Sequence, residues 1–135
     1  MAGQPDHLAQ ARHNTELAEF LAQGMKYKDW VITAAFYAAV HYVEAMLYRD
    51  HKWHSEKECG DGRSPHAWRL QCLRELSTPQ CWVQYRDLYD ASKKVRYLGL
   101  WEKRGSRTAD TYFQEEDVRR FLEQNLPTIR SELGY

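Results

Sequence analysis

An aromatic, alanine-rich segment from Trp30 to Tyr48 restricts the choice of fold more than any other stretch of this sequence. Its apolar residues cover most of the circumference of a helix, which is typical of a helix enclosed by neighbouring helices. His41 and Glu44 interrupt the run, whereas a membrane-spanning helix has about 18 or more uninterrupted apolar residues. The segment therefore predicts a central helix that begins near Lys28, and no membrane span.

Capping signals and helical periodicity predict further helices around this one. Ser64 and Thr78 each precede a proline, which places an N-cap residue before a proline at the first helical position, so one helix follows another after a tight turn. Pro127 is expected to end or bend the last helix, and residues 51–63 are a predicted loop. The predicted helices cover about residues 6–23, 28–48, 65–77, 79–99 and 114–126.

No stretch of the sequence alternates between apolar and polar residues as a strand does, and no segment repeats. A length of 135 residues suits one compact domain. The predicted fold class is all-α, an antiparallel four-helix bundle with an additional C-terminal helix. We expect a single domain over residues 1–135, with its core between about residues 6 and 126.

The composition excludes some classes of protein. Hydrophobic residues make up 43% of the chain, which is too many for a disordered protein. Nineteen Lys and Arg residues balance nineteen Asp and Glu residues, so a nucleic acid or an acidic partner must bind a local patch of charge. Three cysteines without framework spacing, and a first segment without an apolar signal region, lead us to expect a cytoplasmic protein.

Three motifs follow one another along the predicted helices. They are, in order, Asp29-Trp30 with Phe36-Tyr37-Ala38-Ala39-Val40-His41-Tyr42-Val43-Glu44, then His66-x-x-Arg69, then Tyr85-x-x-Leu88-x-x-x-Ser92-x-x-x-Arg96-Tyr97. In order and approximate spacing these motifs resemble those of HEPN-domain proteins, from about residue 7 to about residue 126. The resemblance implies an antiparallel four-helix bundle with an extra short helix and frequent homodimerisation. It also implies roles in RNA cleavage, nucleotide binding, or toxin–antitoxin and defence systems.

One part of the HEPN pattern is missing from the late helix. Ribonucleases of that family resemble one another in an arginine that is followed, a few residues later, by a histidine. Here Arg96 is followed by Tyr97 and by no histidine at that spacing. Either the histidine comes from another helix, or this chain is not a nuclease.

Cleavage of RNA without a metal ion needs a base for the ribose 2′-hydroxyl, an acid for the leaving oxygen and a cation beside the phosphate. The residues that we predict to supply these groups are His41, Glu44, His66, Arg69 and Arg96. His41 or His66 would be the base, the two arginines would hold the phosphate, and Glu44 would orient a histidine. The competing interpretation is a structural network, because buried polar groups must be paired.

A local excess of positive charge begins in the same late helix. Between positions 93 and 107 the cations are Lys93, Lys94, Arg96, Lys103, Arg104 and Arg107, against the single acid Glu102. Interleaved with aromatic residues, such cations can hold phosphates and stack a base. The predicted RNA- or nucleotide-binding residues are Ser92, Lys93, Lys94, Tyr97 and Arg104. The alternative is a solvated helix end whose cations complement the helix dipole.

The predicted loop offers zinc ligand types but no recognisable zinc site. His51-x-x-His54, Cys59 and His66 match no closed structural site, so we predict no bound metal. The sequence has no Walker loop, no dinucleotide glycine fingerprint and no Gly-x-Ser-x-Gly elbow, so we predict no cofactor.

Two functions from different classes fit these patterns. The first is a HEPN-type domain that binds RNA or a nucleotide and acts as a metal-independent endoribonuclease. Its expected partners are a second copy of the chain and a nucleotidyltransferase-like antitoxin. The second is a non-catalytic interaction or dimerisation module in which the His/Glu/Arg network is structural. The missing Arg-to-His spacing favours the second function, whereas the basic stretch and the His and Arg stripes favour the first.

Overall fold

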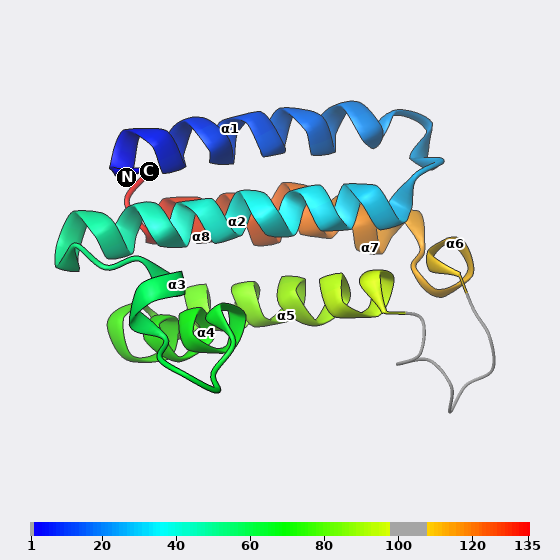
Figure 1. Ribbon diagram of the computed structural model, residues 1–135. Coiled ribbons are helices and arrows are strands. Elements are labelled where there is room, and N and C mark those ends of the chain that lie inside the picture. Colours follow the sequence, from blue (N-terminus) through cyan, green and yellow to red (C-terminus); the bar gives the residue numbers. More distant parts are fainter. Residues whose placement is uncertain (1, 98–107) are drawn as a thin grey trace.

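The computed structural model describes residues 2–97 and 108–135, and this part of the chain forms helices and no strands (Figure 1). In chain order the elements are α1 (Gln4–Leu21), η1 (Gln23–Met25), α2 (Lys28–His51), α3 (Ser55–Glu58), α4 (Pro65–Leu76), α5 (Pro79–Arg96), α6 (Ala109–Tyr112), α7 (Glu115–Arg120), η3 (Phe121–Asn125) and α8 (Leu126–Glu132). The prediction of an all-α fold is confirmed.

Helix α2 is the central element, as its sequence predicts. It packs along α1 and also contacts α5 and α8 (Figure 1). Its residues from Val31 to Leu47 are mostly buried and belong to one hydrophobic cluster with residues of α1, α5 and α8. By length and composition alone α2 could cross a membrane, but 78% of its apolar window is buried by the rest of the structure. Such burial is expected of the core helix of a bundle.

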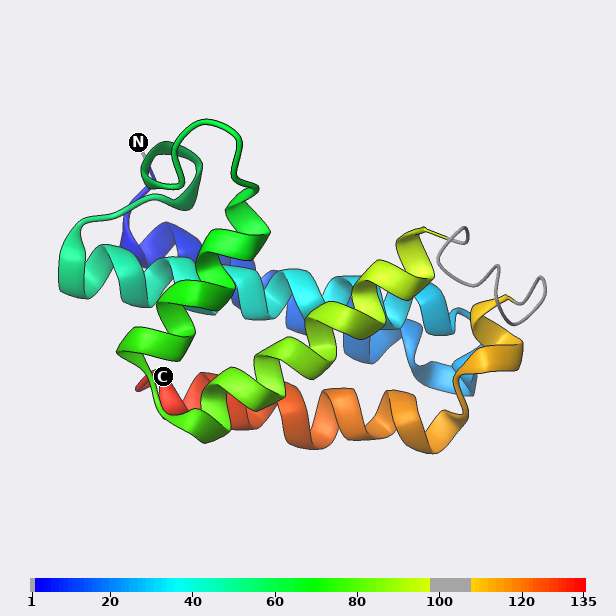
Figure 2. The same ribbon diagram turned by 90° about the horizontal axis from the view of Figure 1, so that it is seen from below.

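Both predicted N-caps are present. Ser64 Oγ accepts a hydrogen bond from the backbone N–H of Ala67 at 3.1 Å, and Thr78 Oγ1 accepts one from Cys81 at 3.1 Å. Only Ser77 and Thr78 separate α4 from α5, so the two helices meet at a sharp turn and diverge from it like the arms of a V (Figure 2). The two helices are closest at this turn, and the first turns of α4 and the last turns of α5 are the far ends of the V (Figure 2).

The C-terminal helix is longer than predicted. Pro127 does not end it, because α7 runs through η3 into α8, which continues to Glu132. η3 is a π-helical turn, and such a widened turn accommodates the missing N–H and the ring of a proline just beyond it. Ile129 and Leu133 are buried, so the core extends beyond its predicted limit at residue 126.

Candidate functional site

A buried ion pair links α2 to α4. Arg69 Nε donates to Glu44 Oε1 at 2.6 Å, and the two side chains are 4% and 3% exposed. Burial alone would raise the pKa of Glu44, but hydrogen bonds from Ser55 and Arg69 outweigh it and leave the pKa below its ordinary value. Burial likewise opposes the charged form of Arg69, yet Tyr85, Glu44 and Glu56 raise its pKa. Both partners are therefore charged at neutral pH although neither is open to solvent.

Helix α3 supplies the remaining partners of this pair. It lies within residues 51–63, which were predicted to form a loop. Ser55 is fully buried and donates both its backbone N–H, at 3.3 Å, and its hydroxyl to Glu44. Glu56 accepts a hydrogen bond from Arg69 Nη2 at 3.4 Å. We call these four residues the Glu44–Arg69 network; its Ser55 was missed because the contact depends on how the chain folds back after α2.

The Glu44–Arg69 network fixes the tautomer of His66. Arg69 Nη1 lies 2.9 Å from His66 Nδ1, and because a guanidinium can only donate, we assign Nδ1 as the acceptor and place the ring proton on Nε2. Burial, followed by the positive charges of Arg69 and Arg96, lowers the pKa of His66 to about 4. At neutral pH this half-buried residue is thus an uncharged imidazole that offers an N–H donor at Nε2.

Aromatic rings and a second arginine surround this imidazole. The ring centroids of Phe36, Tyr37 and Tyr89 lie 5.4, 6.2 and 5.7 Å from that of His66. Arg96 approaches from α5: its Nη1 donates to the Tyr37 hydroxyl at 3.3 Å, and its guanidinium lies 5.5 Å from the Phe36 ring centroid. Aromatic faces attract cations. The rings therefore hold the Arg96 guanidinium near His66 without an acidic partner among the described residues.

A groove between the arms of α4 and α5 adjoins these rings. It has a volume of about 520 Å³ and is lined by Ala67, Leu70, Gln71, Arg74, Trp82, Tyr89 and Lys93. Arg74 lies 5.8 Å from the ring centroid of Trp82, and Lys93 lies 4.4 Å from that of Tyr89. Tyr89 belongs both to this α4–α5 groove and to the rings around His66. Single-stranded nucleic acids bind to such surfaces: their phosphates contact the cations, and their bases stack on the aromatic faces.

His41 lies in a groove that His66 does not line. Its Nδ1 is 3.1 Å from Nδ1 of His7 on α1, and it lines a groove between α1 and α2 that Tyr37 also lines. Burial, followed by the neighbouring His7, lowers the pKa of His41. Of the five predicted catalytic residues, the structure thus brings four into one connected group, namely Glu44, His66, Arg69 and Arg96.

Two of the predicted RNA- or nucleotide-binding residues lie at this group. Lys93 lines the α4–α5 groove. Tyr97 is 56% exposed, and its ring centroid lies 5.3 Å from the guanidinium of Arg96. Both are open to a ligand that reaches His66 along α5.

Two of the other predicted binding residues, Ser92 and Lys94, do not line the α4–α5 groove. Lys94 turns toward α6, where its Nζ donates to the Tyr112 hydroxyl at 2.9 Å. Ser92 is fully buried, so it touches no ligand in this conformation. Arg104, with the rest of the basic stretch that follows Tyr97, lies outside the described residues.

One pair elsewhere in the sequence does have the arginine-to-histidine spacing of HEPN ribonucleases. His54 follows Arg49 at the end of α2, where sequence reasoning overlooked it. Arg49 Nη1 donates to the carbonyl of Leu133 at 3.0 Å, whereas the His54 ring packs 5.0 Å from the ring of Tyr48. The two side chains therefore have different partners and form no common site.

The zinc ligand types noted in the predicted loop do not gather. His51 is exposed and stacks on Trp53 with ring centroids 4.5 Å apart. Cys59 Sγ lies 3.9 Å from the carbonyl oxygen of Glu56, and His66 is bonded to the Glu44–Arg69 network. Within residues 2–97 and 108–135, these side chains form no common set of metal ligands.

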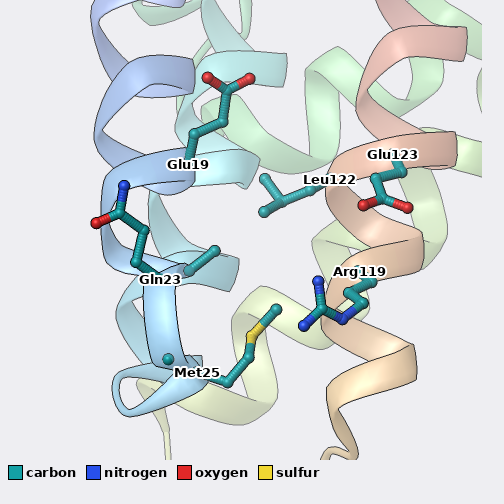
Figure 3. Close-up of a pocket in the computed structure, with 8 residues that line it drawn as sticks. Glu19, Gln23, Met25, Arg119, Leu122 and Glu123 are labelled. Atoms are coloured by element: carbon teal, nitrogen blue, oxygen red, sulfur yellow. The ribbon is translucent and has the colours of Figure 1, made fainter.

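Another recess lies at the opposite end of the molecule, near η1, and contains none of the predicted site residues (Figure 3). It has a volume of about 410 Å³ and lies between Glu19, Gln23 and Met25 on one side and Arg119, Leu122 and Glu123 on the other. The carboxylates of Glu19 and Glu123 line the recess, and Arg119 is the one cation among its lining residues. Arg119 also pairs with Glu115 at 3.7 Å, so the charge of the recess is negative. This charge disfavours a phosphate ligand.

Comparisons with known proteins do not extend the resemblance seen in the motifs. No family model, no curated protein and no solved structure matches this chain. What the chain does is therefore inferred from its motifs and from the arrangement of the site residues.

Acid is expected to destabilise the fold because several half-buried imidazoles are neutral in it. Burial lowers the pKa of His7, His41 and His66. From about pH 6.5 downward the unfolded chain binds protons that the folded chain does not, so the free energy of unfolding falls as the pH falls. After allowance for solvent exposure we expect a loss of about 1–2 kcal/mol between about pH 7 and pH 5, measured by urea denaturation. Equal stability at the two pH values would contradict the lowered pKa values.

Proposed function

We propose that this chain is a HEPN-like domain that binds phosphate groups of single-stranded RNA or of a nucleotide at His66 and Arg96. The observation that supports this best is the position of a neutral imidazole between two guanidinium groups in a partly open site. His66 offers an N–H donor, and Arg96 offers a cation that no carboxylate of the described residues neutralises. A phosphate oxygen accepts from donors of both kinds.

The α4–α5 groove provides a path for the rest of such a ligand. Trp82 and Tyr89 are half-buried, and each has a cation over its ring. A base can stack on a ring face while Arg74 or Lys93 contacts the adjacent phosphate. Lys93 also pairs with Asp90 at 3.3 Å, an exposed contact that a phosphate can replace at little cost.

In this proposal the Glu44–Arg69 network positions the site and does not touch the ligand. Its two central side chains are too deeply buried to reach a phosphate. Arg69 holds Nδ1 of His66, which directs Nε2–H away from the network. Glu44 in turn holds Arg69, since a buried cation without a partner would be costly.

Binding explains this geometry better than proton transfer by His66. A general base needs a free lone pair near the substrate, but the lone pair of His66 is directed at Arg69 and its Nε2 carries the proton. A pKa of about 4 also leaves too little imidazolium for a general acid at neutral pH. Endoribonuclease activity of this chain would therefore depend on His41, in the neighbouring groove.

The packing of the helices supports the HEPN-like part of the proposal. α1, α2, α5 and the joined α7, η3 and α8 would be the four long helices of an antiparallel bundle, since α2 contacts α1, α5 and α8. The additional helix would then be α4 and not a C-terminal one. His66 of α4 and Arg96 of α5 would come together because both contact Phe36 and Tyr37 of α2.

The test is binding of a labelled single-stranded RNA of about ten nucleotides in EDTA, followed by fluorescence anisotropy at increasing salt. We expect binding at low salt that weakens steeply as salt rises, because lysine and arginine contacts to phosphates release counterions. RNA that stays intact on a gel identifies binding without cleavage, and products that disappear in His41→Ala identify a nuclease. Absence of binding at low salt would contradict the proposal.

A second candidate function, dimerisation, is favoured by the groove between α1 and α2. It has a volume of about 250 Å³, and the residues that line it are Asn14, Leu17, Leu21, Trp30, Thr33, Ala34, Tyr37 and His41. Trp30 is 61% exposed and Leu17 is 43% exposed, which is unusual for such large apolar side chains in one groove. The occupant would be a second copy of the chain. Light scattering of the wild type and Trp30→Glu distinguishes a dimer from a monomer.

A further inference from the structure

Glu44 also lies close to two histidines that the proposed phosphate site does not use. His7 on α1 and His54, the N-cap residue of α3, each offer a ring nitrogen, and these two atoms and a Glu44 carboxylate oxygen all lie within 4.8 Å of one another. The group joins the first turns of α1, the last turns of α2 and the start of α3, and the rings of His7 and His54 lie 5.9 Å apart between their centroids. Its members come from three separate parts of the chain.

Both histidines have a buried ring nitrogen without a partner. Nε2 of His7 and Nε2 of His54 are inaccessible to solvent and form no hydrogen bond with the described residues. Buried polar atoms in proteins are nearly always paired. Two rings that adjoin one carboxylate and that each have an unpartnered nitrogen therefore indicate that something binds between them.

The contact between His7 and His41 allows Nε2 of His7 to be a ligand. Their Nδ1 atoms lie 3.1 Å apart, so one of the two must donate. When His7 donates, its Nε2 carries a free lone pair, and His41 becomes the outer hydrogen-bond partner that metal-binding histidines usually have. Burial lowers the pKa of both residues, so both rings are neutral at pH 7, which is the form that binds a metal.

The charges around this group allow a divalent cation to bind. Glu44 and Glu56 both act electrostatically on His7, and the only cation bonded to Glu44 in the described residues is Arg69. Arg69 and the Ser55 hydroxyl contact Oε1 of Glu44, whereas Oε2 accepts only the Ser55 backbone N–H, at 3.3 Å. Oε2 therefore retains a lone pair for a metal ion.

We propose that His7, Glu44 and His54 bind one divalent transition-metal ion, with Zn²⁺ the best match. Two imidazoles and one carboxylate are the protein ligands of open tetrahedral zinc sites, in which water takes the fourth position. Tetrahedral zinc holds its ligand atoms about 3.3 Å apart, so the side chains need to approach by at most about 1.5 Å. Mg²⁺ and Ca²⁺ prefer oxygen ligands and are expected to bind poorly.

No bound metal was predicted from the sequence, and the proposed site departs from that prediction. That prediction weighed His51, His54, Cys59 and His66, which lie within one stretch of the chain. Of these four residues, only His54 belongs to the proposed site. The other two ligands are His7 and Glu44, so the site joins α1, α2 and α3. The ion would link the segment after α2 to the first turns of α1. The proposed metal site does not depend on RNA binding.

Equilibrium dialysis of the EDTA-stripped full chain against ZnCl2, with metal content measured by mass spectrometry, tests the proposal. We expect about one Zn²⁺ per chain, and at least about tenfold weaker binding in His7→Ala and His54→Ala. His13→Ala, on the exposed face of α1, and His51→Ala, an exposed histidine just before His54, are matched controls that should bind like the wild type. The visible spectrum of the Co²⁺-loaded wild type should show tetrahedral bands.

Circular dichroism of the metal-free variants shows whether they are folded. If His7→Ala does not fold, His7→Gln keeps a polar side chain and is expected to lose the Co²⁺ bands. Binding of less than about a tenth of an equivalent of Zn²⁺ would overturn the proposal, as would equal binding by the wild type and both ligand variants. Equal affinity for Mg²⁺ would also overturn it, because the ligand set favours a nitrogen-binding metal.

Discussion

Arg69→Met is expected to lower the free energy of unfolding by about 3–5 kcal/mol. Methionine has a similar volume but no charge, so the substitution leaves the Glu44 carboxylate buried without its cation. The pKa of Glu44 should rise, because burial raises it and only the Ser55 hydrogen bonds remain to oppose that effect. Urea denaturation followed by circular dichroism at pH 7 measures the loss.

Two further variants separate the buried pair from a general effect of changing α4. Arg74→Met alters the same helix at an exposed position and is expected to change stability by less than about 0.5 kcal/mol. Glu44→Gln combined with Arg69→Met removes both charges and should recover part of the loss. A loss below about 1 kcal/mol in Arg69→Met would show that the Glu44–Arg69 network does not hold α4 on α2.

Arg96→Gln is expected to weaken binding of single-stranded RNA by about 10- to 100-fold while leaving the fold intact. The substitution removes the cation that faces His66 and keeps a side chain able to donate to the Tyr37 hydroxyl. Because Arg96 is half-buried and has no acidic partner in the described part of the chain, its loss leaves no buried carboxylate behind. Fluorescence anisotropy at fixed low salt measures the affinity.

Arg130→Gln is the matched control for this measurement. It removes one positive charge from an exposed position on α8 and should change RNA affinity less than about twofold. The salt dependence of binding should become shallower in Arg96→Gln, because one fewer phosphate contact releases counterions. Equal affinity in Arg96→Gln and Arg130→Gln would place the RNA elsewhere.

Local signals in the sequence were enough to predict much of the fold. The apolar circumference of residues 30–48 identified α2 as the central helix, and the Ser64 and Thr78 caps predicted the starts of α4 and α5. These signals depend on neighbours within one or two helical turns, which the sequence displays directly. Of the two effects expected of Pro127, ending the helix is wrong, because a π-helical turn lies directly before it and the helix continues.

The candidate site was predictable only within single helices. His66 and Arg69 are three residues apart, so their contact follows from helical spacing. The contacts of Ser55 and His7 with other elements depend on how the chain returns after α2 and on which face α1 presents. Trp82, Tyr89 and Lys93 share one face of α5, but Arg74 joins them in one groove only because α4 packs against α5 after the turn at Ser77 and Thr78. Such long-range contacts leave no periodic signal in one sequence.

The tautomer and pKa of His66 test the central claim most directly, because the proposed phosphate site depends on its Nε2–H donor. Nitrogen-15 NMR of the imidazole, recorded as the pH is lowered and then as inorganic pyrophosphate is added, reports both properties. We predict a neutral ring protonated at Nε2 down to about pH 5, and a shift of that signal on addition of pyrophosphate that Arg96→Gln abolishes. A ring that titrates near pH 6.5 and does not respond to pyrophosphate would contradict this claim.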